Sequence, residues 1–495
     1  MIRQAAARLR TSNWRTFALF VLCALALRWA SIGELGRHAD ETFYFLVGQR
    51  MHDGVLPYVD VWDRKPLGLF LIYYAIAGIS TSVVAYQVVA CLFAAATAAI
   101  ISAIARPWTG ERSAVLAGLA YLVIIGPFEG ATGQAPDFYN PLIAGAALLL
   151  FGEAERLAQQ EVGRRVWWAM GLCGLALTIK QTTAFEAAFF GFFVLVSLAR
   201  AGASPRKIVR IAALCCAIGV LPTVLIGAYY AAVGHFAEYW HAMVLSNVAK
   251  VRESGGAWRA LSIVVKAAPL LLLAAAGLFL PSGDRRPRLL IGAWIGAAVL
   301  GFLAVPNFYG HYILPVLVPL CVAAAFALSR IRQWIVPALA FAAYSFLWFN
   351  PFDVASSAEN SRRMREMAGL IREHDRGGGL LVFDGPVYLY VQAGKPFLSP
   401  LVFPQHLNHQ IENDVSHLHT REEIDRMLAA GPGVLVMSRF PRSFPVNHYS
   451  RGAVLAYARR NCRIVGVETA DTSGDQLIIF GDCISKARRV GVSTN

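Results

Sequence analysis

The sequence predicts a polytopic α-helical membrane protein with about eleven transmembrane helices, followed by a C-terminal soluble α/β domain. The membrane part follows from composition: 57% of the 495 residues are hydrophobic and only 15% are charged, against about 25% in an average soluble domain. The mean hydropathy of +0.51 agrees. Near residue 350 the long apolar runs give way to a charged helix and short strands. We therefore divide the chain into a membrane domain, 1–349, and a C-terminal domain, 350–495.

Eleven apolar segments are candidates for membrane-spanning helices. A helix needs roughly 20 apolar residues to cross a bilayer. The longer candidates are 16–33, 83–105, 209–232, 260–280, 289–305, 312–328 and 334–349, and the shorter ones are 113–127, 139–152, 166–179 and 183–199. The first segment does not resemble a cleavable signal, because its apolar run exceeds the roughly 7–15 residues of a removable one.

The segment 66–80 decides the orientation of the chain. It has 15 residues, begins with proline and ends at Gly-Ile-Ser, which makes a full crossing doubtful. If it dips into the membrane and returns, the short loops on the side of the N-terminus hold 18 Lys and Arg residues, and the opposite loops hold seven. Because basic loops stay in the cytoplasm, we expect a cytoplasmic N-terminus and an extracytoplasmic C-terminal domain. The three main outer loops are then 34–82, 128–139 and 233–259.

The same distribution of charge explains the net charge of +14. The excess of Lys and Arg lies in the loops expected to face the cytoplasm. It therefore reflects membrane topology, and the sequence predicts no nucleic-acid partner.

The C-terminal domain shows the patterns of a mixed α/β fold. "MREMAGLIREH" has the periodicity of an amphipathic helix, and "GGLLVFDG", "GVLVMS" and "DQLIIFG" are typical of short buried strands. Cys462 and Cys483 are the two cysteines of this domain. Because an outer compartment permits disulfides, we predict a bond between them, provided that the strands beside them bring the thiols close enough.

The first outer loop places two acids directly after the first span and two cations further on. Asp40 and Glu41 are followed by Arg64 and Lys65. The simplest interpretation is structural: Asp40 caps a helix that runs to about residue 53 along the membrane surface, and Glu41 is a favourable first-turn acid.

Other ionisable and aromatic residues fall at the same outer level, and this favours a functional interpretation. They are Arg28, Asp137, Lys180, Arg252, Tyr309, His311 and Tyr312. Each cation alone could extend to the headgroups, but Lys180 interrupts an apolar run between two short helices. Ionisable groups at membrane depth usually face a cavity or a partner. We expect a polar cavity open to the outside, with acids on one wall and cations on the other.

A cavity of this kind suits a lipid-linked sugar phosphate. Lys and Arg would bind the phosphate through charge-assisted hydrogen bonds. A carboxylate could take the proton of an acceptor hydroxyl, and fixed cations would stabilise the charge that moves to the leaving phosphate. The apolar lipid explains why such a site would be built at the membrane.

Several stretches resemble one family. "DETFYFLVGQRMHDG" followed by "RKPLGLF" resembles the first outer loop of the protein O-mannosyltransferase superfamily, which has glycosyltransferase fold C. The resemblance is closer to its bacterial branch, which includes the aminoarabinose transferases of lipid A and lipopolysaccharide-core sugar transferases. "LALTIKQTTAF" and "HYILPVLVPL" are similar to the lysine-containing helix end and the late proline-containing helix of that branch. The resemblance covers roughly residues 1–330.

The resemblance implies an enzyme of the bacterial inner membrane. It would move a hexose or pentose from a polyprenyl-phosphate donor to a glycolipid, polysaccharide or protein of the envelope, by an inverting single displacement. Asp40 occupies the place of the family's catalytic base, with Glu41 beside it, and Asp137 that of its second-loop acid. Lys65 matches the lysine that binds the donor phosphate, although Leu67 replaces the second proline of the family's Lys-Pro-Pro turn.

The remaining candidates complete this expected site. Arg64, Lys180 and Arg252 are expected to help bind the donor phosphate. The expected acceptor wall consists of Asp137, Tyr309, His311 and Tyr312. Members of the family differ in whether they need a divalent metal, and the metal is left open here. Its candidate oxygen and nitrogen ligands are Asp40, Glu41, Asp137 and His311.

Two other classes of protein compete with the transferase. A transporter or flippase of lipid-linked sugars would often show inverted repeats and polar residues at the bilayer midplane, and the sequence shows no such repeat. A sensor with a ligand-binding outer domain would leave the long polar first loop unexplained. The depth of the polar cluster separates the first two classes: the outer leaflet favours a transferase and the midplane a transporter.

Overall fold

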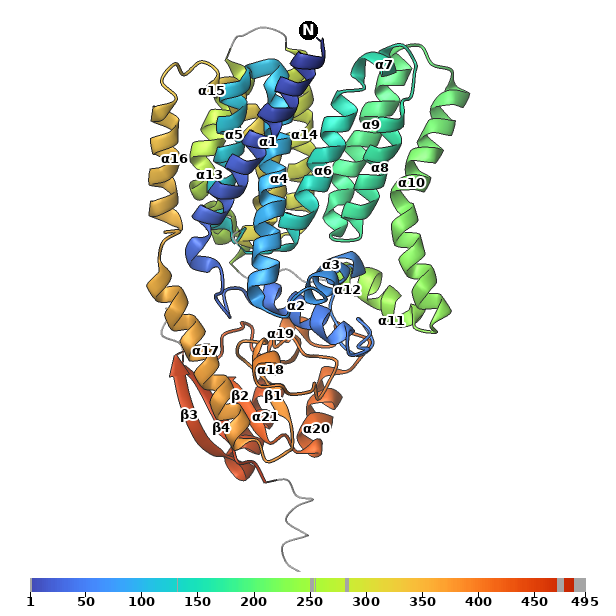
Figure 1. Cartoon of the computed structure of the whole chain (residues 1–495). Coiled ribbons are helices and arrows are strands. Elements are labelled where there is room, and N and C mark those ends of the chain that lie inside the picture. Colours follow the sequence, from blue (N-terminus) through green and yellow to red (C-terminus); the bar gives the residue numbers. More distant parts are fainter. Residues whose placement is uncertain are drawn as a thin grey trace, which may run out of the picture.

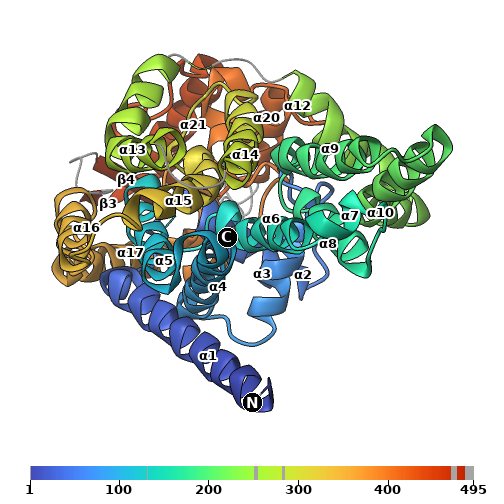
Figure 2. The same ribbon diagram turned by 90° about the horizontal axis from the view of Figure 1, so that it is seen from above.

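The computed structural model describes residues 2–130, 132–249, 253, 255–280, 285–469 and 476–484. Long helices form one layer, with the N-terminus at its upper end in Figure 1, and a C-terminal α/β region lies below it. Short helices lie between these two parts. In the view from above, α1 and α10 stand at the periphery, whereas α15 lies among other helices (Figure 2).

One helix of the upper layer corresponds to each of the eleven predicted apolar segments. These helices are α1 (Ile2–Leu27), α4 (Val83–Thr109), α5 (Glu111–Ile124), α6 (Ala135–Phe151), α8 (Arg164–Leu177), α9 (Ala184–Arg200), α10 (Pro205–Ala232), α13 (Gly256–Phe279), α14 (Arg286–Leu303), α15 (Leu314–Leu328) and α16 (Ile335–Trp348). The short elements of this part are η1 (Trp29–Ser31), η2 (Gly126–Phe128), α7 (Ala154–Ala158), η3 (Gln181–Thr183), α11 (Phe236–Trp240), the π-helical turn η4 (His241–Leu245), α12 (Ser246–Val248) and η5 (Gly310–Ile313).

Six helical stretches of the described chain are long and apolar enough to cross a membrane. They are Val83–Thr109, Gln181–Arg200, Pro205–Ala232, Gly256–Phe279, Arg286–Leu303 and Gly310–Leu328. Four apolar helices are shorter: Trp14–Leu27, Leu67–Ala77, Ala135–Phe151 and Ile335–Trp348. The chain is thus a mostly helical protein with several potential spans, and the number of eleven crossings stays a prediction.

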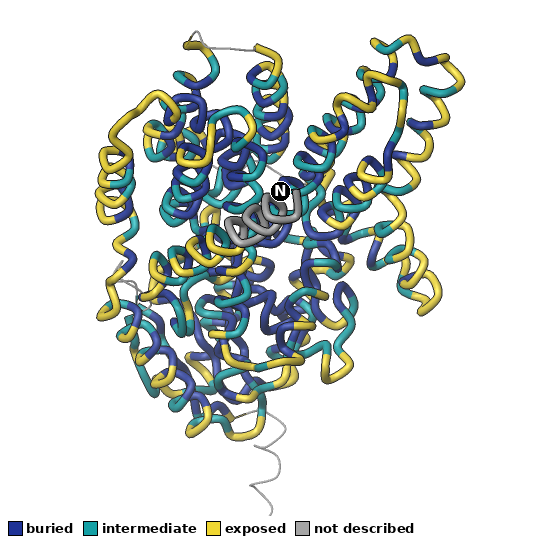
Figure 3. Tube along the Cα trace, turned by 45° about the horizontal axis from the view of Figure 1, so that its top comes forward, coloured by how far each residue is buried: buried dark blue, intermediate teal, exposed yellow. Residues whose placement is uncertain are grey.

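The surface of the helical layer has the character expected next to lipid. On α10, Leu221, Val224 and Leu225 are each more than half exposed, and exposed segments run along α10 and α16 (Figure 3). Such continuous apolar exposure is unusual for a protein surrounded by water. The central helix α15 differs, since every residue except Pro315 is buried, against α4, α5, α13 and α14 among others.

The segment predicted to dip into the membrane forms α3 (Leu67–Ala77). Its 11 residues are too few for a crossing, and it lies beside α2 (Ala39–Met51) below the helical layer (Figure 1). The two helices approach closely at Gly48, where a β-carbon would lie 2.6 Å from the carbonyl carbon of Tyr73.

The helix α2 is covered on more than one side, whereas a helix lying along the membrane surface would leave one face exposed. All residues of 41–48 are buried. One side of α2 packs on α3, where Phe43 contacts Phe70, and another side packs on the C-terminal region, where Phe43 contacts Phe403 at 5.2 Å between ring centroids. The α/β region covers the face that would otherwise meet solvent.

The C-terminal region contains the strands that the sequence predicts. A four-stranded sheet has the order β1-β2-β4-β3. Its strands are β1 (Leu380–Val382), β2 (Val434–Ser438), β3 (Arg463–Thr469) and β4 (Gln476–Gly481), and its helices are α17 (Val354–His374), α18 (Leu389–Gln392), α19 (Gln405–Asn408), η6 (Gln410–Glu412), α20 (Thr420–Ala430) and α21 (His448–Asn461). β1 and β2 are parallel, whereas β4 pairs antiparallel with both neighbours.

One contact anchors the first outer loop in this region, and a disulfide links two segments within the region. Trp62, from the first outer loop, is fully buried in the core of the sheet region, and its backbone amide donates to the carbonyl of Pro400. The first loop is therefore anchored in the C-terminal region. The predicted disulfide is confirmed: Cys462 and Cys483 are bonded, at the end of α21 and just after β4.

Candidate active site

A polar cavity of about 270 Å³ lies between the helical layer and the C-terminal region. Seven segments that are distant in the sequence contribute to its walls. They are 38–40 at the start of α2, 63–65 before α3, Glu129 and Gln134 between η2 and α6, 180–181 between α8 and α9, Asn247 and Glu253 at and after α12, 309–312 before α15, and 403–412 around α19. The cavity is therefore built at the ends of helices and in loops, at the level where the two parts of the protein meet.

An ion pair between Asp40 and Lys65 lines this cavity. Asp40 is the second residue of α2, whose N-cap is His38, so the interpretation of Asp40 as the cap was wrong. Its Oδ2 lies 3.7 Å from Lys65 Nζ, and its side chain is 26% exposed toward the cavity. Burial works against ionisation of Asp40, but the ammonium of Lys65 and the imidazole of His311 outweigh it and hold its pKa below the usual value.

The backbone around Lys65 is fixed independently of its side chain. Its amide donates to Asp63 Oδ1 at 2.7 Å, and its carbonyl accepts from Tyr58 Oη at 2.9 Å. The ammonium lies 4.9 Å from the ring centroid of Tyr44. Burial lowers the pKa of Lys65, but Asp40 and Asp63 raise it by more, so the ammonium stays charged.

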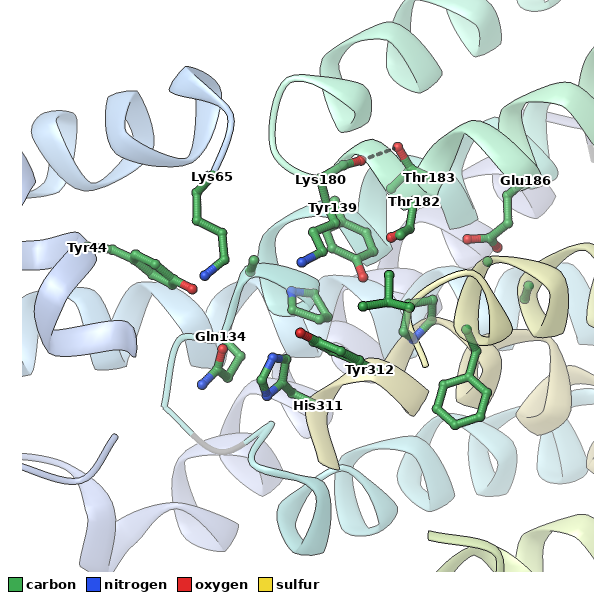
Figure 4. A pocket seen from close by; sticks show the side chains of 17 residues that line it. Tyr44, Lys65, Gln134, Tyr139, Lys180, Thr182, Thr183, Glu186, His311 and Tyr312 are labelled. Carbon is green, nitrogen blue, oxygen red and sulfur yellow. Dashed lines mark hydrogen bonds between the residues drawn. The ribbon is translucent and has the colours of Figure 1, made fainter. Parts of the chain in front are cut away.

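Lys180 supplies a second cation to the same cavity. It sits at the turn between α8 and η3, and its Nζ lies 5.2 Å from the ring centroid of Tyr312. Figure 4 shows the ammonium groups of Lys65 and Lys180 extending into the same space from opposite elements. Two ammonium groups that face one polar space form a suitable cradle for a phosphate.

Two glutamates contact the aromatic residues on one wall of the cavity. His311 Nδ1 lies 2.7 Å from Glu129 Oε2, and Tyr309 donates its hydroxyl to Glu253 Oε2 at 2.6 Å. Glu253 also receives the side-chain amide of Asn307. These contacts fix the loop before α15, which carries three of the predicted site residues.

Arg64 belongs to a separate cluster of charges at the edge of the cavity. Its guanidinium lies 2.8 and 2.7 Å from the two carboxylate oxygens of Glu412 and 5.6 Å from the ring centroid of Trp62. His406 lies between Glu412 (3.5 Å) and Asp63 (3.8 Å). Glu412 engages the guanidinium of Arg64, which also lines the cavity, and its role in binding the phosphate stays a prediction.

The charges of this cluster support one another. Burial raises the pKa of Asp63, but Lys65 and His406 outweigh it and lower the value to about 2. Burial lowers the pKa of His406, but the carboxylates of Asp63 and Glu412 raise it above its usual value. The cluster joins the first loop to the C-terminal region. The sequence of neither segment indicates that these residues are in contact.

Two predicted site residues are not in the cavity wall, and a third is not among the described residues. Glu41 is fully buried and accepts a hydrogen bond from the Thr132 hydroxyl, on the side of α2 away from the cavity. Asp137 is also buried, near Arg28, whose guanidinium donates to the Gly130 carbonyl. Arg252 lies outside the described residues.

The four expected metal ligands are not brought together. Asp40 and His311 line the cavity, whereas Glu41 and Asp137 lie behind it. Within the described part of the chain, no three His, Cys, Asp or Glu side chains are arranged to hold a metal ion.

Several cavity residues were not among those predicted from the sequence. They are His38, Asp63, Glu129, Gln134, Glu253, Gln405, His406 and Glu412. Asp63 and Glu129 lie in outer loops already thought to be functional, so their position was a usable hint. His406 and Glu412 come from the C-terminal region, and only the tertiary contact with the first loop reveals them.

The chain is similar to known proteins in its structure, whereas comparisons of its sequence give no match. No family model and no curated protein sequence matches the chain. The crystal structure of ArnT from Cupriavidus metallidurans bound to undecaprenyl phosphate aligns with a TM-score of 0.62 and 15% identity, over 93% of this chain and 97% of ArnT.

The oligosaccharyltransferase of Archaeoglobus fulgidus is also similar. Its apo form aligns with a TM-score of 0.51 and 13% identity, over 86% of this chain and 69% of the enzyme. The form tethered to an acceptor peptide with the sequon NVT aligns with a TM-score of 0.52 and 12% identity, over the same shares of the two chains. Both proteins have glycosyltransferase fold C. The chain therefore has this fold, as its resemblance to the O-mannosyltransferase superfamily implied.

Proposed function

We propose that the protein is a membrane glycosyltransferase that moves a sugar from a polyprenyl-phosphate donor to an extracytoplasmic acceptor. The observation that carries the proposal is the Asp40–Lys65 pair, with Lys180 opposite, in a polar cavity at the end of the helical layer. A carboxylate beside two cations provides both a base for the acceptor and a binding site for the donor phosphate.

The comparisons support the choice of substrates. ArnT was crystallised with undecaprenyl phosphate, a polyprenyl phosphate, in the same fold. The archaeal oligosaccharyltransferase was crystallised with an acceptor peptide. We propose the same class of lipid-linked donor here, with a glycolipid, a polysaccharide or a protein of the envelope as the acceptor.

The reaction would proceed as a single displacement. Asp40 takes the proton of the acceptor hydroxyl while that oxygen attacks the anomeric carbon of the sugar. The bond from this carbon to the phosphate oxygen breaks, and its electron pair stays on the phosphate, where Lys65 and Lys180 stabilise the new charge. Attack opposite the leaving group inverts the anomeric configuration. The aromatic wall of Tyr309 and Tyr312 would receive the acceptor.

Donor binding would also activate the base. In the structure Lys65 Nζ is close to both Asp40 and the space that a phosphate would fill. A bound phosphate shares this ammonium, so Asp40 loses part of its neutralising charge. Because an opposite charge lowers the basicity of a carboxylate, Asp40 becomes a stronger base once the donor is in place.

The proposed location is a bacterial inner membrane, with the N-terminus in the cytoplasm. The asymmetry of basic loops supports this orientation. The Cys462–Cys483 disulfide supports an oxidising compartment for the C-terminal region. The first loop, anchored in this region by Trp62, would then lie on the same outer side.

A transporter or flippase is less well supported. Lys180, Tyr312 and the Asp40–Lys65 pair line one cavity together with Phe403, His406 and Glu412 of the C-terminal region. The helix α2, which carries Asp40, lies between the helical layer and that region (Figure 1). A site that carries a headgroup across the membrane would lie near the midplane.

The decisive experiment asks whether the donor is cleaved. The purified full chain in lipid nanodiscs is incubated with envelope extract and a polyprenyl phosphate that carries a labelled sugar. We expect polyprenyl phosphate to appear and the label to move to an envelope component, which mass spectrometry of a deletion strain identifies independently. An intact donor that only changes leaflet in proteoliposomes would show a transporter instead.

A further inference from the structure

His406 stands between two carboxylates in the wall of the active-site cavity. It belongs to α19 of the C-terminal region. Its Nε2 lies 3.8 Å from Asp63 Oδ2, and its Nδ1 lies 3.5 Å from Glu412 Oε2. All three residues are buried, and all three line the cavity. Solvent and salt therefore screen the charges of this group far less than those of surface residues.

The geometry around His406 favours a protonated ring. A neutral imidazole has one nitrogen that donates and one that only accepts, and an ionised carboxylate only accepts. Because each ring nitrogen of His406 faces a carboxylate, a neutral ring would turn one lone pair toward another acceptor. The pKa of His406 agrees: burial lowers it, but Asp63 and Glu412 raise it above its usual value.

Aromatic contacts hold the ring of His406 in this position. The ring of Trp62 meets it edge to face, with 4.6 Å between centroids, and the ring of Phe403 lies at 5.6 Å. Trp62 is fully buried, and its backbone amide donates to the carbonyl of Pro400. None of these contacts needs the charge of the imidazole. A neutral side chain at position 406 should therefore leave the first loop anchored in the C-terminal region.

Asp63 connects His406 with the phosphate-binding lysine. Its Oδ1 accepts from the backbone amide of Lys65 at 2.7 Å, whereas its Oδ2 faces His406. Asp63 also attracts the Lys65 ammonium: burial lowers the pKa of Lys65, but Asp40 and Asp63 raise it by more. An uncompensated carboxylate at Asp63 would compete with the donor phosphate for this ammonium and repel the phosphate.

The other acid beside His406 has a cation of its own. Glu412 Oε2 lies 2.7 Å from Arg64 Nη2. The charge that the imidazolium of His406 offsets is therefore mainly that of Asp63. The charged groups around the ring thus form one series, from Arg64 through Glu412, His406 and Asp63 to Lys65.

We propose that His406 is a positioning residue, which neutralises Asp63 and so keeps the Lys65 ammonium available to the donor phosphate; this inference rests on the proposed function. With His406 charged, Asp63 fixes the backbone of Lys65 without opposing the phosphate. When the imidazole loses its proton at higher pH, Asp63 again draws on the Lys65 ammonium and the affinity for the donor falls. The C-terminal region thereby makes the donor site sensitive to pH.

The test measures binding of polyprenyl phosphate methyl ester to the purified full chain in nanodiscs at a series of pH values. This phosphodiester resembles the linkage of the donor, and it lacks the second ionisation of a phosphate monoester near pH about 6. The wild-type affinity should fall roughly 10-fold as the pH rises through the pKa of His406, the Coulomb effect of one carboxylate at roughly 10 Å with an effective dielectric constant of about 20.

His406→Gln should show the weaker affinity at every pH, without this step. His38 and His311 also line the cavity, so this comparison, and not the pH of the step, assigns it to His406. In the transfer reaction, His406→Gln should raise the KM for the donor and change kcat much less, because the contact between Asp40 and Lys65 remains.

A second substitution separates neutralisation of Asp63 from a merely structural role. Asp63→Asn removes the charge but keeps an oxygen that accepts from the Lys65 amide. Added to His406→Gln, it should restore the affinity for the ester, which repair of a structural defect would not explain. His409→Gln is the matched control and should keep the wild-type step. His409 is 5% exposed, as His406 is, but contacts the carbonyl of Phe444 and does not line the cavity.

Two results would overturn the inference alone. One is His406→Gln protein with the affinity and the pH dependence of the wild type. The other is a defect in His406→Gln that Asp63→Asn does not repair. If His406→Gln does not fold, Asp63→Asn alone decides: it should bind the ester without the step, and a persistent step would contradict the inference. Wild-type protein that binds neither the ester nor polyprenyl phosphate would instead refute the proposed function, and the inference with it.

Discussion

Replacing Lys65 by methionine tests the link between donor binding and the basicity of Asp40. The substitution removes the ammonium but keeps a side chain of similar length. The backbone contacts with Asp63 and Tyr58 do not involve this side chain, so the loop should keep its shape. Lys65→Met therefore isolates the effect of one charge.

The structure sets the size of two effects. First, the loss of a charge-assisted hydrogen bond costs about 1.5–3 kcal/mol, which weakens donor binding by roughly 10-fold to 150-fold. Second, Lys65 lies 3.7 Å from Asp40, where two charges interact by about 4 kcal/mol at an effective dielectric constant of 20. Removal of such a neighbour typically raises the pKa of a carboxyl group by about 1–3 units.

The assay is the pH dependence of transfer. Asp40 acts as a base only when ionised, and its lowered pKa keeps it ionised below the usual aspartate range. The acidic limb of the wild-type profile should therefore lie at low pH. In Lys65→Met it should move to higher pH by about 1–3 units, while the KM for the donor rises.

A matched control removes the same charge elsewhere. Lys266 lies on α13, 5.9 Å from the ring centroid of Trp348, and does not line the cavity that holds Asp40 and Lys65. Lys266→Met should change neither the KM for the donor nor the acidic limb. If Lys65→Met behaves in the same way as this control, Lys65 neither binds the phosphate nor tunes Asp40.

Three further predictions concern the joint between the first loop and the C-terminal region. Arg64→Ala breaks a buried ion pair with Glu412 and should lower the free energy of unfolding by about 3–5 kcal/mol, with little change in the KM for the donor; a donor defect without a loss of stability would assign Arg64 to the phosphate after all. Burial opposes the charge on His406, but Asp63 and Glu412 raise its pKa, so its protonation stabilises the fold below pH about 6.5 and this contribution disappears as the pH rises through the higher pKa of the folded state. The thermal stability of the wild-type protein should therefore fall between pH 6.5 and this pKa, and it should fall more than that of His406→Gln. Parallel profiles of the two proteins would contradict the argument. Cys462→Ser opens a loop with a sequence separation of 21 residues and should cost roughly 3 kcal/mol in denaturant unfolding, whereas equal stability with and without reductant would exclude this contribution.

The sequence predicts where the helices and strands lie better than it predicts what packs against each of them. Apolar runs located the eleven helices of the upper layer, and short apolar stretches between glycine and aspartate located β1, β2 and β4. These signals are local. What covers α2 depends on Phe403 and its neighbours, which lie some 360 residues further along the chain, and no periodicity within the helix could show this.

The same limit explains the site. Asp40, Lys65, Lys180 and Tyr312 meet in the cavity as the outer-level pattern suggested. Glu41 does not, because consecutive residues on a helix point about 100° apart and only one of the two acids can face the cavity. Spacing alone could not tell which one.

Arg64 shows a second kind of limit. As an exposed cation in an outer loop it was a reasonable candidate for the phosphate. Its partner Glu412 lies 348 residues away and contacts the guanidinium through one hydrogen bond and one further ion-pair contact. A single sequence shows which residues are charged, but the pairing of those charges requires the folded chain.

The central claim is that Asp40 is the base of a glycosyl transfer, and Asp40→Asn tests it most directly. Asparagine preserves the size of the side chain, and because His38 is the N-cap of α2, the substitution does not disturb the start of the helix. In purified, folded protein with a polyprenyl-phosphate sugar, we predict a fall of about 100-fold or more in the rate of transfer, in line with the usual 10²–10⁴ contribution of general-base catalysis. Transfer by Asp40→Asn at the wild-type rate would contradict the claim.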